Sequence, residues 1–295
     1  MWRRLSSVHG PSRDVPAVAR TYVAMAGGEA VGVATALVST VHAPLRMLVV
    51  NVCPHRRREG IGSGLVVAVA DDPAISGGPF LIRIPAGDPS GLGFSAQLGL
   101  AVVNRAFGLE VDPESPAVHV WLKGLRTPAD LGCDVRRPGE AGWPGTAAFV
   151  DFLHDGYRRC HETWTPCPGF PPERREGFFL SELELDSQVA LTRGAEMVAA
   201  ASLRRDETFG PEPLHLVFAY ASPSDPAAED LVGAVVAECV RYAAARGRKI
   251  AWEFHETDAA ALLHARQLGG RRLIDLMLCG PGAGREFPPE GVTSR

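Results

Sequence analysis

The sequence predicts an α/β (α+β) chain made of two tandem halves, each a mixed, mostly antiparallel sheet flanked by helices. The first observation behind this prediction is an internal repeat whose matches keep the same order in both halves. The second is that the apolar pattern alternates in the first strands of each half and becomes continuous in the later ones, as in sheets covered by helices. The repeat rests on three pairs of segments: 96–100 with 266–270, 80–84 with 249–253, and 29–37 with 195–203.

Each half is expected to begin with an antiparallel pair of strands, followed by a third strand and a helix. A fourth strand, a second helix and a final strand then close the half. In the first half the expected strands are 21–25, 31–38 and 46–52, and the helix is 62–70. In the second half the expected strands are 189–192, 197–203 and 214–220, and the helix is 228–245.

The halves differ in what precedes their paired strands. The second half has a long segment there with a predicted helix at 146–162, whereas the first half has only a short segment there. A stretch rich in Pro and Gly at 126–144 predicts a boundary between domains. We therefore expect a first domain at 1–130 and a second at 131–295.

Composition restricts the class of protein. The chain has 295 residues and a net charge of −4, which gives no general field for polyanions. No apolar run reaches the roughly 18 residues that span a bilayer, and the basic start lacks the apolar core of a signal peptide, so we expect a cytoplasmic protein that does not act at a membrane. The six cysteines show no CxxC spacing; Cys160, His161 and Cys167 come nearest to a metal cluster, and we predict no metal site.

The segment 53–64, CPHRRREGIGSG, places arginines and glycines between a buried strand and a helix. A glycine turn before a helix exposes main-chain N–H groups at the positive end of the helix dipole, which favours binding of an anion, most often phosphate. A Walker loop would need Gly-Lys-Ser/Thr, and a Rossmann fingerprint needs GxGxxG after a parallel strand. The GxGxG spacing here fits neither, whereas several convergent donors favour a diphosphate.

The segment 52–62 resembles the V-x-P-x-x-[RQ]-x-x-G-x-[GA] motif of the GNAT N-acyltransferases, and 94–100, FSAQLGL, is similar to that family's F-Y-x-x-L-G-F motif. The motif resemblance covers about residues 16–125 of the chain, and the second half resembles the same fold by pattern only. Together they imply two tandem GNAT-like domains, of which the first lacks the usual N-terminal elements. The motif resemblance also implies that acetyl-CoA is the co-substrate and that an amine attacks its thioester directly. The implied coenzyme A-binding residues are Val50, Asn51 and Val52 on a splayed strand, and Arg57, Arg58, Glu59, Gly60, Ile61, Gly62 and Ser63 in the loop and helix.

Two departures from the family pattern concern catalysis. Ser95 stands where the family usually places a tyrosine that protonates the leaving thiolate, and Asn51 stands in the region of a frequent glutamate base. A thiol with a pKa of about 8.5 leaves without much help. His42, in the turn before the third strand, is a further candidate base, and a water molecule is an alternative to it.

The second half has no comparable anion loop. The segment 221–230, ASPSDPAAED, has two prolines and three acids, and Ala265 stands at the tyrosine position, so this half should not bind coenzyme A. The resemblance instead suggests that it closes the acceptor side of the first domain, or serves as an interface. Candidate wall and polar residues are Trp143, Trp164, Phe178, Phe179, Glu253 and His255, although each of the aromatic ones is more typical of a core.

The resemblance favours an acetyl-CoA-dependent N-acetyltransferase that acts on a small-molecule amine, as in tandem GNAT enzymes of specialised metabolism. One alternative is a GNAT-like transferase that takes an aminoacyl group from tRNA, which the cluster at Arg56–Arg58 keeps open. Another is a non-catalytic acyl-CoA-binding protein, which the missing tyrosine and glutamate favour. A homodimer stays open as a second way of closing the acceptor side.

Overall fold

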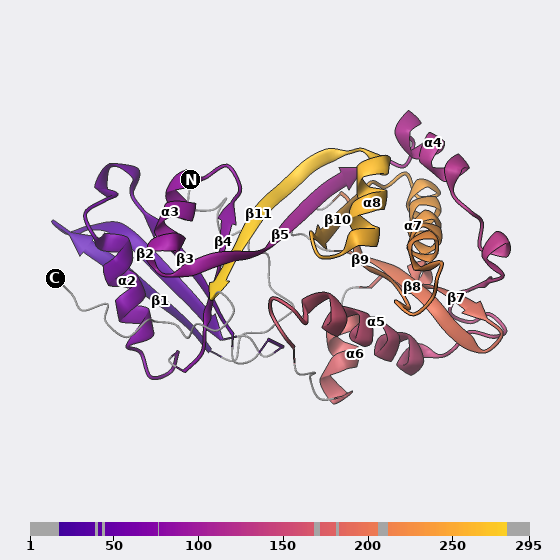
Figure 1. Cartoon of the computed structure of the whole chain (residues 1–295), viewed down its shortest axis with the longest axis horizontal. Coiled ribbons are helices and arrows are strands. Elements are labelled where there is room, and N and C mark those ends of the chain that lie inside the picture. The colour runs from indigo at the N-terminus through magenta and orange to yellow at the C-terminus, as the bar shows by residue number, and fades with distance from the viewer. Residues whose placement is uncertain are drawn as a thin grey trace. The chain divides into compact units, whose positions relative to one another are not determined.

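The computed structural model describes residues 18–38, 41–42, 45–75, 77–167, 172–180, 183–205 and 212–281, and the chain forms two compact units (Figure 1). The N-terminal unit holds the described residues between 18 and 105, together with 163–167 and 276–281. The C-terminal unit holds 106–162 and the described residues between 172 and 275. The short segment predicted to precede the first paired strands lies outside the described residues.

The sheet of the N-terminal unit has the strand order β1-β2-β3-β4, followed by β11 and β5. The pairs β1–β2, β2–β3 and β4–β11 are antiparallel, and the pair β3–β4 is parallel. Gly27 and Gly28 have φ angles of 59° and 84°, which allow the tight turn between β1 and β2. The elements are β1 (Val18–Ala26), β2 (Glu29–Val38), β3 (Arg46–Val52), the 3-10 helix η1 (Pro54–Arg56), α2 (Ile61–Ala70), β4 (Phe80–Pro85), α3 (Pro89–Gln97), and parts of β5 (Leu100–Val111) and β11 (Arg271–Pro281).

The sheet of the C-terminal unit continues from β5 through β10-β9-β8-β7-β6, with the parallel pair β10–β9. Helices α7 and α8 pack on one face of this sheet, and α5 packs on the other, where Tyr157 meets Phe218 of β9 (Figure 1). The elements are α4 (Pro116–Gly124), η2 (Ala129–Leu131), β6 (Asp134–Arg136), α5 (Thr146–His161), α6 (Pro172–Leu180), η3 (Leu185–Ser187), β7 (Val189–Arg193), β8 (Glu196–Arg205), β9 (Leu214–Ala221), α7 (Ala228–Ala244), β10 (Ile250–His255) and α8 (Ala259–Leu268).

Strands β5 and β11 each belong to both units, so the units are not two continuous segments. In the N-terminal unit β4 pairs with β11, from Leu276 opposite Pro85 to Cys279 opposite Ile82. In the C-terminal unit β10 pairs with β5 over six residues. The expectation that each half is closed by its own final strand is therefore wrong in this detail. The predicted segments 1–130 and 131–295 match the two units only in part, because residues 106–130 lie in the C-terminal unit and 276–281 in the N-terminal unit.

The predicted repeat reappears in small irregularities that the two units share. Both hairpins carry a shift in strand register at the corresponding place, where one residue of the second strand is skipped in the pairing. In both units the residue after the third strand donates its main-chain N–H to the carbonyl of that skipped residue. An aspartate caps the second helix of each half. The pairs are Ala24/Met25 and Leu191/Thr192 for the shift, Cys53–Val31 and Ser222–Val198 (both 2.9 Å) for the hydrogen bond, and Asp88 and Asp258 for the cap.

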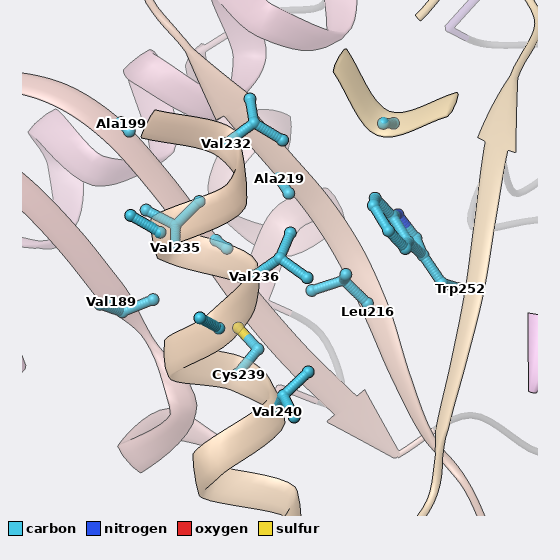
Figure 2. Close-up of a cluster of buried hydrophobic side chains, with 14 of the residues drawn as sticks. Val189, Ala199, Leu216, Ala219, Val232, Val235, Val236, Cys239, Val240 and Trp252 are labelled. Atoms are coloured by element: carbon cyan, nitrogen blue, oxygen red, sulfur yellow. The ribbon is translucent and has the colours of Figure 1, made fainter. Parts of the chain in front are cut away.

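The core of the C-terminal unit is built around α7. Figure 2 shows one flank of this helix turned toward β9 and β10, with Val236 pointing toward Leu216 and Trp252. Val235 and Cys239 are fully buried. Eleven of the 17 residues of α7 are buried, which explains why this stretch reads as almost continuously apolar.

Candidate functional site

Strands β3 and β4 diverge within the N-terminal unit. Their parallel pairing ends at Leu48 opposite Ile82. Strand β3 nevertheless continues to Val52, paired on its other side with β2, and β4 continues to Pro85, paired on its other side with β11. We call the opening between 49–52 and 83–85 the fork, and the Leu48–Ile82 pair its vertex.

The main-chain groups that face the fork follow from the alternation along a strand. Arg46 donates its N–H to a carbonyl just before β4 (2.8 Å), whereas Cys53 donates its N–H to a carbonyl of β2 (2.9 Å). Because neighbouring residues face opposite sides, Val50 and Val52 direct their N–H and C=O groups into the fork. Asn51 directs its main chain toward β2, so only its side chain is left for a site.

The loop after β3 leads into the amino end of α2. Gly60, the N-cap, has a φ of 79°, and Arg58 has a φ of 70°, a region that residues other than glycine seldom adopt. No side chain caps α2, and its first internal bond runs from the N–H of Gly64 to the carbonyl of Gly60 (2.9 Å). The N–H groups of 61–63 are thus available, and the helix dipole makes this end attractive to an anion.

A close contact brings this helix end against α3 and β3. A Cβ atom placed on Gly62 would lie 3.2 Å from the ring of Phe94 and 3.6 Å from Val52. Gly62 belongs to the motif at 52–62 and Phe94 to the motif at 94–100, so the fold brings the two motifs together.

The charged residues of the loop divide into two groups. Arg56 and Glu59 form an ion pair (2.6 Å), and this hydrogen-bonded guanidinium lowers the pKa of the Glu59 carboxyl. Arg57 is exposed, and its Nε donates to the carbonyl of Val52 (3.4 Å). Arg58 is exposed and has no ion-pair partner among the described residues. Arg57 and Arg58 are therefore the cations available to an anion, while Glu59 is held by Arg56.

Ser95 lies inside the unit. It is 2% exposed, and its hydroxyl donates to the carbonyl of Leu92 in the same helix (2.9 Å). Its neighbour Cys279 on β11 is fully buried, and this burial raises the pKa of the Cys279 thiol, which the Ser95 hydroxyl partly offsets.

His42 lies at the other end of β3. Its Nδ1 is 3.0 Å from the carbonyl oxygen of Thr165. The five residue steps from Arg46 to Asn51 alone span roughly 16 Å of strand. The structure therefore does not bring His42 to Asn51, and only the residues of the fork, the loop and α2 come together.

The C-terminal unit has a fork of its own, with different surroundings. The pairing of β9 and β10 ends at Leu216 opposite Trp252, although both strands continue. In the following loop the Asp225 carboxylate accepts the N–H of Ala227 (2.9 Å) and pairs with Arg193. The Ala227 N–H and then Arg193 lower the pKa of Asp225.

Helix α5 covers this second fork on one face. A Cβ atom on Gly156 would lie 2.4 Å from the ring of Tyr220, and burial raises the pKa of Tyr220 to about 12. The predicted wall aromatics pack within units: Trp143 lies 5.3 Å from Phe149, and Phe179 is fully buried against Phe178.

The other predicted polar and aromatic residues are less enclosed. The ring of His255 lies 5.2 Å from that of His161, and Glu253 is half-buried on β10. Trp164 is half-buried in the N-terminal unit. Sequence reasoning missed Arg83, whose only signal is that it interrupts the apolar run of β4.

The described part of the chain shows neither a metal cluster nor a membrane-spanning helix. It contains no group of three or more His, Cys, Asp or Glu residues placed to hold a metal ion. None of its helices combines the length and the apolar character that crossing a membrane would need.

The chain resembles known proteins in its structure rather than in its sequence. No protein-family model matches it, and no curated protein matches it in sequence. A GCN5-related N-acetyltransferase from Sphaerobacter thermophilus aligns with a TM-score of 0.61 at 16% identity, covering 88% of this chain and 79% of that one. The chain has the GNAT fold.

Two further solved structures extend this likeness over nearly the whole chain. A tandem GNAT protein from the clavulanic acid biosynthesis pathway aligns with a TM-score of 0.58 at 16% identity, covering 95% of this chain and 88% of that one. A GNAT-family acetyltransferase from Colwellia psychrerythraea gives 0.56 at 12% identity, with 94% and 95% covered. The GNAT fold predicted from the motifs at 52–62 and 94–100 is therefore confirmed.

Proposed function

We propose that the chain is an acetyl-CoA-dependent N-acetyltransferase that acts on a small-molecule amine and binds its co-substrate in the N-terminal unit. The observation that carries this proposal is the fork between β3 and β4, beside a helix end that no side chain caps. An extended chain can pair with the main chain of a strand whose neighbour has turned away, while an anion binds the free N–H groups of a helix end.

The residues present fit coenzyme A. The N–H groups of 61–63 and the guanidinium groups of Arg57 and Arg58 would hold the diphosphate, and the main chains of Val50 and Val52 would pair with the pantetheine arm. Acetyl-CoA supplies the activated acyl group when bound. The N–H of Val50, the fork-facing donor nearer the vertex, would stabilise the negative charge that develops on the acyl oxygen, usually the largest single catalytic effect.

Proton transfer needs little from this chain. Ser95 is buried and donates to its own helix, so we do not assign it the role of acid, and a thiol leaving group with a pKa of about 8.5 does not require one. Asn51 cannot accept a proton, but its half-buried amide can orient an amine or a water molecule. We propose that a water molecule takes the proton of the amine as it attacks.

A non-catalytic acyl-CoA-binding protein is the second candidate, because Ser95 is enclosed and His42 lies away from the fork. Release of free thiol from acetyl-CoA, followed over a panel of amines, decides between the two. Thiol release that depends on an amine, with the acetylated amine found by mass spectrometry, is the expected result. Binding of acetyl-CoA without turnover of any amine would favour the second candidate, and absence of binding would favour an aminoacyl-tRNA donor.

A further inference from the structure

Arg83 is a charged residue in an apolar strand. It stands in β4, where four of the other five residues are buried and hydrophobic. Its Nε is buried without a hydrogen-bond partner, and the described residues provide no ion pair for its guanidinium. Arg83 as a whole is half-buried, but a buried donor atom without a partner is costly, so a partner that binds from outside the chain would be favourable here.

The strand register places Arg83 beside the vertex of the fork. It follows Ile82, the last residue of β4 that pairs with β3, and it lies opposite Leu278 of β11. Its neighbours Ile82 and Ile84 point into the core cluster that contains Leu65 of α2. Because side chains alternate between the faces of a strand, Arg83 points to the face away from α2.

That face is partly exposed beside the fork, where Arg83 and Asn51 are half-buried. Helices α2 and α3 both pack on the other face, where Leu65 and Val66 of α2, and Phe94 of α3, contact the core. The two described helices of this unit longer than one turn therefore do not cover the face of Arg83, although Leu81 and Leu278 on that face are buried, so only part of it is exposed. By the same alternation, the side chain of Asn51 lies on this face, because Leu48 and Val50 face the core.

The C-terminal unit shows that the fold does not require a cation here. Glu253 follows Trp252, the last residue of β10 that pairs with β9, and thus occupies the place that corresponds to Arg83, one residue further along than the sequence match of 80–84 with 249–253 implies. The corresponding position thus carries opposite charges in the two units. A guanidinium offers a planar set of donors that matches a carboxylate or phosphate.

We propose that Arg83 binds an anionic group of the acceptor, so that the substrate is an amine that carries a carboxylate or a phosphate. This inference rests on the proposed function only for the place where the amine binds. Arg83 holds the anionic group at the vertex, and the amine of the same molecule is thereby positioned near the main chain of Val50.

The test measures binding of amines to the full chain loaded with coenzyme A, by calorimetry, so that it needs no turnover. The probes are matched pairs: amino acids against their amides, and O-phosphoethanolamine against ethanolamine. The wild type should bind the anionic member of at least one pair at least tenfold more tightly than the neutral member. The pair that shows this preference tells whether the acceptor carries a carboxylate or a phosphate. Arg83→Gln should remove this preference, while Arg83→Lys should keep part of it.

Arg266→Gln is the matched control, because Arg266 is exposed on α8 and makes no ion pair among the described residues. It should leave the preference unchanged, and the acetyl-CoA affinity of all three variants should stay within about twofold of the wild type. No preference in the wild type, or the same preference in Arg83→Gln, would overturn the proposal. Failure of the proposed function would appear separately, as absence of thiol release with acetyl-CoA.

Discussion

The two units carry the same fork and surround it differently. In the N-terminal unit the fork lies beside the start of α2 and two available arginines, and neither α2 nor α7 has a side-chain cap. In the C-terminal unit the corresponding loop brings the Asp225 carboxylate to the start of α7, and Glu229 and Asp230 stand in the first turn of that helix. The comparison teaches that the divergence of the strands belongs to the fold, whereas the charge at the helix end decides whether an anion can bind.

The largest effect on the second fork is expected from Gly156→Ala. The added methyl group would lie 2.4 Å from the Tyr220 ring, which sits where α5 covers β9. Overpacking of this kind costs about 1–3 kcal/mol, which lowers the Tm by roughly 2–4 °C per kcal/mol in a chain of this size. Differential scanning calorimetry measures the change.

Gly177→Ala on α6 is the control, because no atom lies within 4 Å of a Cβ at that position. It should leave the Tm unchanged or slightly raised, since alanine is the better helix former. A Gly156→Ala protein as stable as the control would contradict the close packing of α5 on the second fork.

A smaller effect is expected from Asp225→Asn. The folded chain lowers the pKa of Asp225, so the stability that this carboxylate contributes is present above its ordinary pKa near 4 and is lost as the pH falls through the folded value. The variant should therefore have a lower Tm than the wild type at pH 7, and the difference should be smaller at about pH 3. Equal Tm values at both pH values would show that the pair with Arg193 stabilises nothing.

The smallest effect is expected from Ser95→Ala. Loss of a general acid costs roughly 10²–10⁴-fold in rate, whereas Ser95 donates to Leu92 in its own helix. Acetyl transfer by the variant should stay within about threefold of the wild type, with the same pH profile. A hundredfold loss with a displaced pH profile would make Ser95 the acid after all.

Much of the N-terminal unit could be predicted from local sequence. The helix expected at 62–70 is observed at Ile61–Ala70, because a glycine turn and an apolar run mark its start. The exchange of β5 and β11 could not be predicted, since pairing between strands far apart in the sequence leaves no local pattern.

The residues of the site likewise differ in whether local sequence could predict their place. The loop at 57–63 is recognisable because its backbone needs glycine and its charge is concentrated in one segment. The enclosure of Ser95 depends on Cys279, which lies far along the chain, and the place of Arg83 depends on strand register. A single arginine in an apolar strand gives no indication of which face it occupies until the neighbours of that strand are known.

Calorimetric titration with acetyl-CoA tests the central claim most directly, on the wild type, on a Gly60→Asp, Gly62→Asp double variant, and on Ser224→Asp as the control in the second loop. The wild type and Ser224→Asp should bind about one molecule per chain, because only one of the two loops favours an anion. The double variant should lose binding, because it places two carboxylates at the helix end. Two sites per chain, or binding that survives in the double variant, would contradict a single site in the N-terminal unit.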